Sequence, residues 1–226
     1  MKFDVYCRRI VAVGIHMPRS KAALVFLVLL FACGARFAPP FAIAGEQPTR
    51  STDTLFHGIT RPPRDAAAFP LPLSSPRIIV KKAQRKLFLY SGDKLVRTYR
   101  IGLGLSPVGD KVRQGDRRTP EGDFYIFTKN DKSAFYLSLG ISYPNAPHAE
   151  RGLRDGLITK AQYNTIMQAL DAHKAPTQNT KLGGDIYIHG NGAGSDWTWG
   201  CVALENDDIR ELFNSVTVGT PVTIRP

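Results

Sequence analysis

The feature that most constrains the fold is a series of short β-type runs that begins near Arg77 and continues almost to the end of the chain. The runs are three to nine residues long, rich in branched and aromatic residues, and separated by Gly, Pro, Asn and Asp clusters typical of turns. They are 78–80, 86–90, 95–101, 123–128, 135–142, 185–189 and 216–224, the last with a turn at Gly219-Thr220-Pro221 inside it. Residues 77–226 are therefore predicted to form one mainly β domain, a sandwich or barrel.

Two helical patterns interrupt the β-type runs. The first covers about Lys160–His173, where Thr159 and Gln162 have the spacing of a capping box. The second is predicted to follow Asn206 as N-cap, because Asp207 and Asp208 then occupy the positive first turn of the helix. The first of these helices is interpreted as an insertion into the β domain.

Residues 1–44 have the layout of a secretory signal segment. Basic residues precede an unbroken apolar run at 22–32, which is shorter than the roughly 20 residues that a membrane-spanning helix needs. Ala42-Ile43-Ala44 then offers a small-residue cleavage site. Two alternatives are a lipoprotein signal that ends at Cys33 and an uncleaved anchor, and translation starting at Met17 would give a complete leader as well. The prediction is export to the periplasm or cell envelope.

Residues 45–76 contain six prolines and no sustained period, so they are predicted to be a linker. The chain as a whole has a net charge of +11, and the part after residue 44 keeps 24 basic and 18 acidic residues. A basic exported protein suits an anionic polymer such as the cell wall or a membrane surface. The sequence has neither a Lys/Arg cluster on a helical pattern nor an RNA-binding signature, which argues against a nucleic-acid partner.

Cysteine use points to one position. Cys7 and Cys33 lie in the predicted leader, so the exported chain would keep Cys201 alone. An unpaired thiol in an oxidising compartment is a liability unless it has a use, although a small buried core residue is the plain alternative. The histidines at 57, 148, 173 and 189 have no zinc-ligand spacing with it, so no metal is expected.

His189 ends a predicted strand twelve residues before Cys201. Gly190 follows the histidine and Gly200 precedes the cysteine. A nucleophilic thiol needs a base, and the two side chains meet if the loop folds back. Gly200 would allow a sharp turn that aims N–H groups at an oxyanion, and the Gly190 carbonyl could accept the second imidazole proton.

The segment 188–209, IHGNGAGSDWTWGCVALENDDI, resembles the active-site stretch of L,D-transpeptidases of the YkuD type. That family has a histidine after a strand and then Ser/Thr-x-Gly-Cys. The segments 118–124 (RTPEGDF), 141–145 (ISYPN) and 218–222 (VGTPV) are also similar to family segments. The resemblance covers residues 77–226 and implies a YkuD-like β fold with a few helices.

The resemblance also implies a reaction. Cys201 would attack the carbonyl of the third residue of a peptidoglycan stem peptide, release D-alanine and form a thioester, with His189 as base and then acid. The amides of Gly200 and Cys201 would form the oxyanion hole, and no cofactor is expected. An amine, including one on a wall-linked protein, or water would resolve the thioester.

The substrate-binding residues are less defined. Trp197, Trp199, Tyr143, Asn191 and Arg118 are the candidate lining of the substrate cleft. Core packing is the alternative for the two tryptophans, and a structural role is the favoured alternative for Tyr143. Many family members have His or Lys where this chain has Trp199, and Arg where it has Ala203, and the loop from His189 to Cys201 is shorter than usual. Besides Arg118, the candidates to replace that arginine are Arg151 and Arg154.

Three other functions remain open from the sequence. A carboxypeptidase or amidase would use the same thioester and hand it to water. A non-catalytic wall-binding module would use the basic charge and the tryptophans but would not need Cys201 and His189 together. A structural or toxin-like secreted protein has no positive feature in its favour.

Overall fold

The computed structural model describes residues 72–226. The predicted leader and nearly all of the predicted linker lie outside the described residues. Strand β1 begins at Pro76, one residue before the predicted domain start. None of the helices in residues 72–226 has both the length and the apolar character that crossing a membrane requires.

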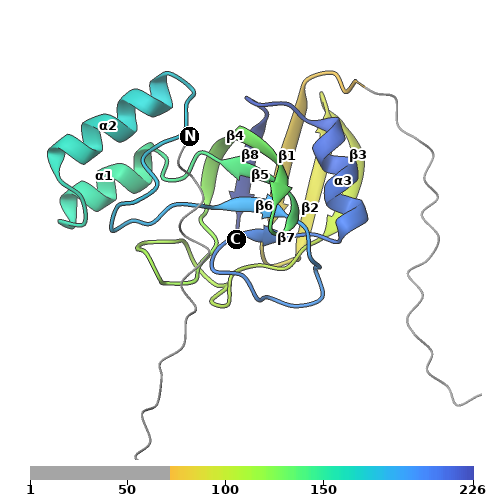
Figure 1. The fold of residues 1–226 in the computed structure, drawn as a ribbon, viewed down its shortest axis with the longest axis horizontal. Helices are drawn as coiled ribbons and strands as arrows, with labels where there is room; N and C mark the ends of the chain where they lie inside the picture. The colour runs from red at the N-terminus through yellow and green to blue at the C-terminus, as the bar shows by residue number, and fades with distance from the viewer. Residues whose placement is uncertain (1–71) are drawn as a thin grey trace, which may run out of the picture. The chain divides into compact units, whose positions relative to one another are not determined.

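The domain is built on one curled eight-stranded sheet, which confirms the predicted mainly β class (Figure 1). The strand order is β3-β2-β1-β8-β4-β5-β6-β7. The bounds are β1 (Pro76–Lys81), β2 (Lys86–Ser91), β3 (Lys94–Arg100), β4 (Gly122–Ser133), β5 (Tyr136–Ile141), β6 (Tyr187–His189), β7 (Val202–Ala203) and β8 (Pro221–Arg225).

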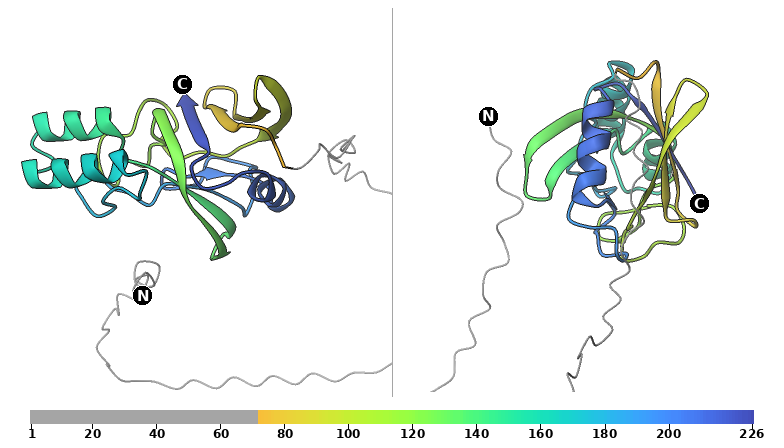
Figure 2. Two further views of the ribbon diagram at one scale, coloured as in Figure 1. Left: turned by 90° about the horizontal axis from the view of Figure 1, so that it is seen from above. Right: turned by 90° about the vertical axis from the view of Figure 1, so that its right-hand side faces the viewer.

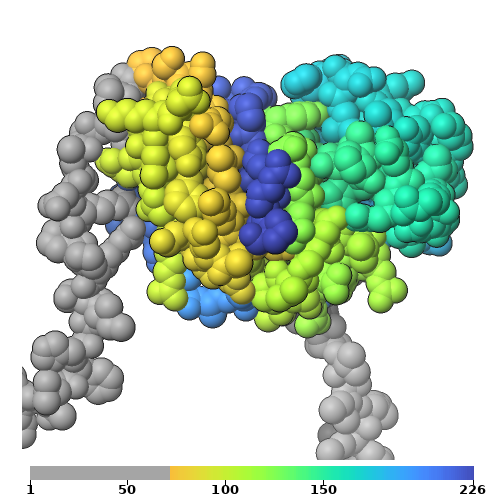
Figure 3. Space-filling model, turned by 180° about the vertical axis from the view of Figure 1, so that it is seen from behind, coloured from red at the N-terminus to blue at the C-terminus, as the bar shows by residue number. Residues whose placement is uncertain are grey.

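The last strand is inserted between distant parts of the chain. β8 pairs in parallel with β1 and antiparallel with β4, and Figure 3 shows it between these strands on the back of the molecule. Val222 and Ile224 point into the core while Thr223 between them faces outward, as the period of a strand requires. The predicted strand at 216–224 is too long, because Val216 ends a helix and only the part after the turn pairs.

Three helices lie on two sides of the sheet. α1 (Ala146–Arg154) and α2 (Lys160–Asp171) pack on each other at one side and α3 (Asn206–Ser215) lies at the other (Figure 2). α1 was not predicted, although Asn145 caps it and a proline stands in its first turn. The predicted capping box of Thr159 and Gln162 is confirmed.

The predicted N-cap of α3 is wrong. Glu205 is the N-cap, and the Asn206 side chain instead accepts the N–H of Asn191. The Glu205 carboxylate accepts the N–H of Ala193 in turn. Polar side chains at the start of α3 therefore hold the loop that follows His189, rather than the helix's own amides.

Apolar residues from both ends of the sheet share one core. It includes Val80 of β1, Leu139 of β5, Ile188 of β6, and Ile209 and Leu212 of α3. A smaller separate cluster joins α1 and α2 around Ile166. The main core packs β6 and β7 against α3, which fixes the strands that carry His189 and Cys201.

Candidate active site

His189 and Cys201 lie on one face of two neighbouring parallel strands. β6 pairs with β7 so that Ile188 is opposite Val202 and His189 is opposite Ala203. Continuing this register by one residue places Cys201 beside Tyr187. Paired residues of parallel strands share a face, and so do residues two apart along a strand. The imidazole and the thiol therefore face the same side, offset by two residues.

The thiol makes its hydrogen bonds with the backbone at the start of β6. Sγ of Cys201 accepts the Tyr187 N–H at 3.4 Å and donates to the Asp185 carbonyl at 3.5 Å. No hydrogen bond joins Cys201 to His189 within residues 72–226. The predicted base and nucleophile are thus neighbours that do not touch in the free protein.

Burial keeps this thiol protonated. The residue is only half-buried, but its sulfur is desolvated, and this raises the pKa of the Cys201 thiol to about 11. The Tyr187 N–H and the Lys111 ammonium act in the opposite direction, while the Asp185 carboxylate adds to the rise. The free protein therefore holds a neutral thiol near pH 7.

His189 is oriented by its own backbone. Its Nδ1 lies 2.7 Å from the carbonyl oxygen of Gly190, the acceptor named from the sequence. A carbonyl can only accept, so Nδ1 carries the proton and Nε2 is the basic nitrogen. Burial lowers the pKa of His189, and the hydrogen bond to Gly190 opposes this. The rings of Phe135 and Trp197 pack on the imidazole, with centroids 4.6 and 5.5 Å away.

The turn before Cys201 is held by hydroxyl groups. Gly200 has φ +129°, a conformation for which glycine is suited. Its N–H donates to the Thr198 hydroxyl at 3.1 Å, and that hydroxyl donates to the Cys201 carbonyl at 2.8 Å. Thr119 also donates to the Cys201 carbonyl. The Gly200 amide is therefore engaged and does not point freely toward an oxyanion, which corrects the predicted pair of amides.

Two of the predicted substrate-binding residues are built into the structure. The side chain of Tyr143 is fully buried and its hydroxyl donates to the Leu182 carbonyl at 3.0 Å, so it offers no surface to a ligand. The Trp197 indole donates to the Gly192 carbonyl at 3.0 Å and walls His189. For Tyr143 the structure thus agrees with the structural alternative and not with a place in the cleft lining, because a tyrosine with a buried partner for its hydroxyl suits the core.

The other three are more accessible. Trp199 is 69% exposed, two residues before the thiol, with the Arg117 guanidinium 4.8 Å from its ring centroid. Asn191 is exposed and adopts a positive φ of 72°. Arg118 is half-buried, and its guanidinium lies 3.4 Å from the Asp110 carbonyl. Its side chain thus follows the loop rather than standing free.

The structure adds charged residues that the sequence did not single out. Lys111 is buried, donates to the Asp116 carboxylate at 2.8 Å and acts on the thiol. Asp185 precedes β6 and contacts the thiol through its carbonyl. Isolated charged residues in loops carry no motif, so the sequence held no signal for either. Among residues 72–226, no cluster of His, Cys, Asp and Glu could hold a metal ion.

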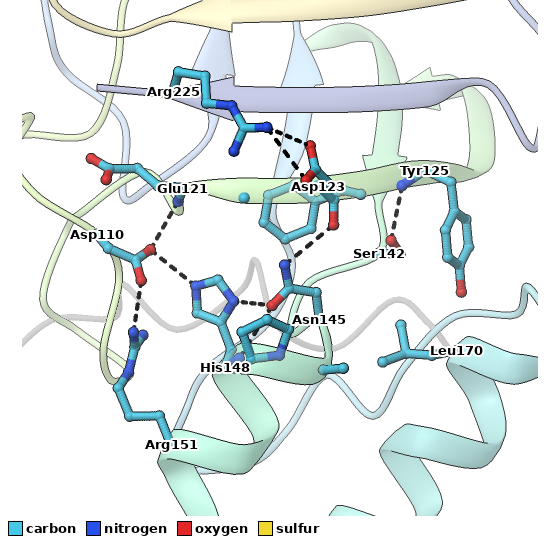
Figure 4. Close-up of a pocket in the computed structure, with 14 residues that line it drawn as sticks. Asp110, Glu121, Asp123, Tyr125, Ser142, Asn145, His148, Arg151, Leu170 and Arg225 are labelled. Carbon is cyan, nitrogen blue, oxygen red and sulfur yellow. Dashed lines mark hydrogen bonds and ion pairs between the residues drawn. The ribbon is translucent and has the colours of Figure 1, made fainter.

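A cavity of about 610 Å³ lies away from the thiol, between β4, β8 and the two-helix insertion (Figure 4). Asp110 lines it and binds His148 at 2.9 Å and Arg151 at 2.9 Å. Burial opposes ionisation of Asp110, but hydrogen bonds from His148, the Glu121 amide and Arg151 lower its pKa to about 2. Arg151 is thus committed here, and an exposed Arg154 pairs with Asp155.

The fold and the site define a class of protein: a mainly β domain with a histidine and a cysteine on one face of two parallel strands. The model of the L,D-transpeptidase catalytic domain, YkuD, matches residues 75–224. The chain therefore belongs to the YkuD family, which confirms the resemblance found in the sequence.

Named relatives are distant. The probable L,D-transpeptidase YcfS of Escherichia coli (strain K12) is 29% identical over 174 residues, which cover 72% of this chain and 50% of YcfS. YafK of the same strain is 29% identical over 147 residues, or 62% of this chain and 46% of YafK. The chain spans about half the length of these curated relatives.

Solved structures of L,D-transpeptidases and of a cell shape determining protein match this chain at low identity. The L,D-transpeptidase (residues 123–326) from Xylanimonas cellulosilytica DSM 15894 has a TM-score of 0.42 and 16% identity, covering 69% of this chain and 63% of that chain. The helical cell shape determining protein Pgp2 from Campylobacter jejuni has a TM-score of 0.43 and 19% identity, covering 68% of this chain and 51% of that chain.

Proposed function

We propose that this protein is an exported, cysteine-dependent L,D-transpeptidase that acts on peptidoglycan stem peptides. The observation that carries the proposal is the placement of Cys201 and His189 on one face of β6 and β7, with the imidazole Nδ1 held by the Gly190 carbonyl. Such an imidazole presents a basic Nε2 toward the side of the strands where the thiol stands. Membership of the family supplies the substrate class.

The reaction begins with the neutral pair. Sγ of Cys201 attacks the carbonyl carbon of the third stem residue while the thiol proton passes to Nε2 of His189. The bond to the terminal D-alanine then breaks, and the imidazolium gives its proton to the leaving amine. The products are a thioester on Cys201 and free D-alanine, with His189 neutral again.

The charges of the free site favour a proton transfer that is coupled to attack. The thiol pKa is raised and the imidazole pKa is lowered, so a thiolate–imidazolium pair is unfavourable before substrate arrives. Sγ must also leave its contacts with Tyr187 and Asp185 to reach Nε2. Catalytic hydrogen bonds commonly tighten only in the substrate complex, which agrees with the separation of the two groups here.

One backbone donor suits the developing oxyanion. The Cys201 N–H makes no hydrogen bond within residues 72–226, whereas the neighbouring Gly200 N–H is bound to Thr198. We therefore assign the Cys201 amide as the first oxyanion donor. A single well-aimed donor of this kind contributes about 2.7–4 kcal/mol to a transition state.

The second half of the reaction decides between transfer and hydrolysis. An amine of another stem peptide or of a wall-linked protein would give transpeptidation, and water would give carboxypeptidase or amidase activity. Either way the protein would work outside the cytoplasm, because its polymeric substrate lies in the cell envelope.

The experiment follows both the protein and the products. Purified wild type and the variants Cys201→Ala and His189→Asn would be incubated with disaccharide-tetrapeptide, with and without an added amine acceptor. Intact-mass measurement reads the thioester adduct, and chromatography reads D-alanine and cross-linked product. We expect an adduct in wild type only, and the product ratio separates transfer from hydrolysis. Wall binding by all three proteins without turnover would instead identify a binding module.

A further inference from the structure

One carboxylate beside the thiol has no counter-ion. Asp185 donates its N–H to the Gln178 side chain at 2.8 Å and accepts the Cys201 thiol on its carbonyl at 3.5 Å. Its carboxylate makes neither a hydrogen bond nor an ion pair within the described part of the chain. Asp185 is exposed, so a ligand can reach it.

The backbone places this carboxylate close to the reacting sulfur. Asp185 has φ +54°, a left-handed conformation that aspartate tolerates better than most residues. Gly184 before it lies against the backbone of Gln178, where an added Cβ would come within 2.3 Å of the carbonyl oxygen. The side chain is one methylene long, so its carboxylate stays near a backbone carbonyl that lies 3.5 Å from Sγ.

The charge of Asp185 works against the nucleophile. Desolvation raises the pKa of its carboxyl, and its charge adds to the burial that raises the pKa of Cys201 and of Tyr187. The same charge thus acts on the Cys201 thiol and on Tyr187, whose N–H binds that thiol at the start of β6. The buried cation nearby, Lys111, is already committed to Asp116. The Asp185 carboxylate therefore hinders formation of the Cys201 thiolate in the free protein. A cation bound to Asp185 would cancel this effect.

We propose that the Asp185 carboxylate binds the ammonium group of a stem-peptide diamino acid beside Cys201. This inference rests on the proposed function, because the third stem residue is usually a diamino acid. The ammonium comes either from the side chain of the acyl donor or from the amine of the acceptor. In both cases it neutralises Asp185 and lowers the cost of forming the thiolate, so the correct substrate helps to activate the thiol.

The first test needs no peptidoglycan chemistry. Full-length wild type and Asp185→Asn would react with aminoethyl methanethiosulfonate, which is cationic, and with methyl methanethiosulfonate, which is neutral. In each case the thiolate displaces methanesulfinate and forms a disulfide, which is quantified on the Cys201 peptide by mass spectrometry. The ratio of the two rates cancels any change in thiol pKa, because both reagents meet the same thiolate.

We expect Asp185→Asn to lower the cationic-to-neutral rate ratio about three- to tenfold, as one charge within several ångströms of a solvated site predicts. Asp93→Asn is the matched control. Asp93 is fully exposed in the turn between β2 and β3, at the other end of the sheet from β6 and β7. An unchanged ratio in Asp185→Asn overturns the proposal.

The second test identifies the source of the ammonium. Thioester formation would be measured with a diamino acid at the third position and with norleucine there, followed by partitioning of the thioester between amine and water. If Asp185→Asn slows thioester formation only with the amine-bearing donor, the ammonium belongs to the acyl donor. If the variant slows only the transfer of the thioester to an amine, the ammonium belongs to the acceptor. Equal losses with both donors and with water overturn the proposal. If wild type forms no thioester but its cationic-to-neutral rate ratio still falls in Asp185→Asn, the proposed function is refuted. The ammonium site at Asp185 is then retained.

Discussion

Gly200 offers the sharpest test of the geometry around the nucleophile. A Cβ added there would lie 2.7 Å from the Arg118 carbonyl oxygen and 3.1 Å from the Ile186 side chain, and φ is +129°. The carbonyl is backbone, in a loop where the Asp116 carboxylate binds the Arg118 N–H. Gly200→Ala thus adds backbone strain of about 1–3 kcal/mol and a contact that forces the loop to move.

The two effects together predict a loss of at least about 2 kcal/mol. For a domain of this size each kcal/mol lowers Tm by about 2–4 °C, so we expect a fall of about 4–8 °C or more. Thermal unfolding by calorimetry measures it. Reactivity of Cys201 toward methyl methanethiosulfonate should change in the same variant, because the displaced turn carries the thiol.

Gly194→Ala is the matched control in the same loop. No atom lies within 4 Å of its added Cβ, and its φ is outside the left-handed region. Its Tm should stay unchanged or rise slightly, as replacing a permissive glycine restricts the unfolded chain. If Gly200→Ala and Gly194→Ala have Tm values within about 1 °C of each other, the turn at Gly200 is not closely packed against the Arg118 carbonyl.

Three further predictions concern the turn before the thiol, the thiol itself and the network around Asp110. Thr198→Val removes the buried partner of the Gly200 N–H and the Cys201 carbonyl and should lower the free energy of unfolding by about 1–3 kcal/mol, whereas Thr198→Ser should restore most of it in denaturant titrations. Alkylation of Cys201 by iodoacetamide should keep rising from about pH 7 to 10 without a plateau, because the thiol pKa is about 11, and a plateau below pH 9 contradicts this burial. The folded pKa of Asp110 is about 2 against an ordinary 3.8, so its ionisation stabilises the protein above pH 3.8 and this contribution is lost as pH falls toward 2. The free energy of unfolding, measured in urea, should therefore fall less over that pH range in Asp110→Asn than in wild type. Equal falls in the two proteins would refute the network around His148.

The fold was predictable where local patterns decide it. Alternation and a four-residue turn placed β2 and β3, and the capping box placed the start of α2. α1 escaped notice because its apolar spacing is sparse, although Asn145 and Pro147 are good start signals. The N-cap of α3 could not be read locally, since Asn206 is drawn away by the amide of Asn191.

Most contacts within the candidate site could not be predicted from the sequence. His189 and Cys201 stand out because each adjoins a glycine in a segment that resembles a family motif. The Gly190 carbonyl follows because an imidazole N–H needs an acceptor. Where the thiol points depends on the register of β6 against β7, and that register comes from pairing across the sheet. No local pattern in the sequence encodes it, which is why Asp185 emerged only from the structure.

The segment 118–124 (RTPEGDF), which resembles a family segment, is held in place by one buried ammonium group. Lys82 is 2% exposed and its Nζ donates to the Gly109 carbonyl at 2.6 Å, the Thr119 carbonyl at 2.9 Å and the Glu121 carboxylate at 2.7 Å. A buried cation is tolerable only when it is paired and all its protons are bound, and here three acceptors do this. These bonds draw together the two ends of the loop 109–119.

Two hydrogen bonds connect the Lys82 ammonium with the backbone of Cys201 through Thr119. The Thr119 hydroxyl, fixed by the Lys82 contact at its carbonyl, accepts the Gly104 N–H and donates to the Cys201 carbonyl. A glycine is needed at 104, because a Cβ there would lie 2.1 Å from the Arg117 carbonyl oxygen. The motif residues of this loop therefore act by positioning the turn that carries the thiol.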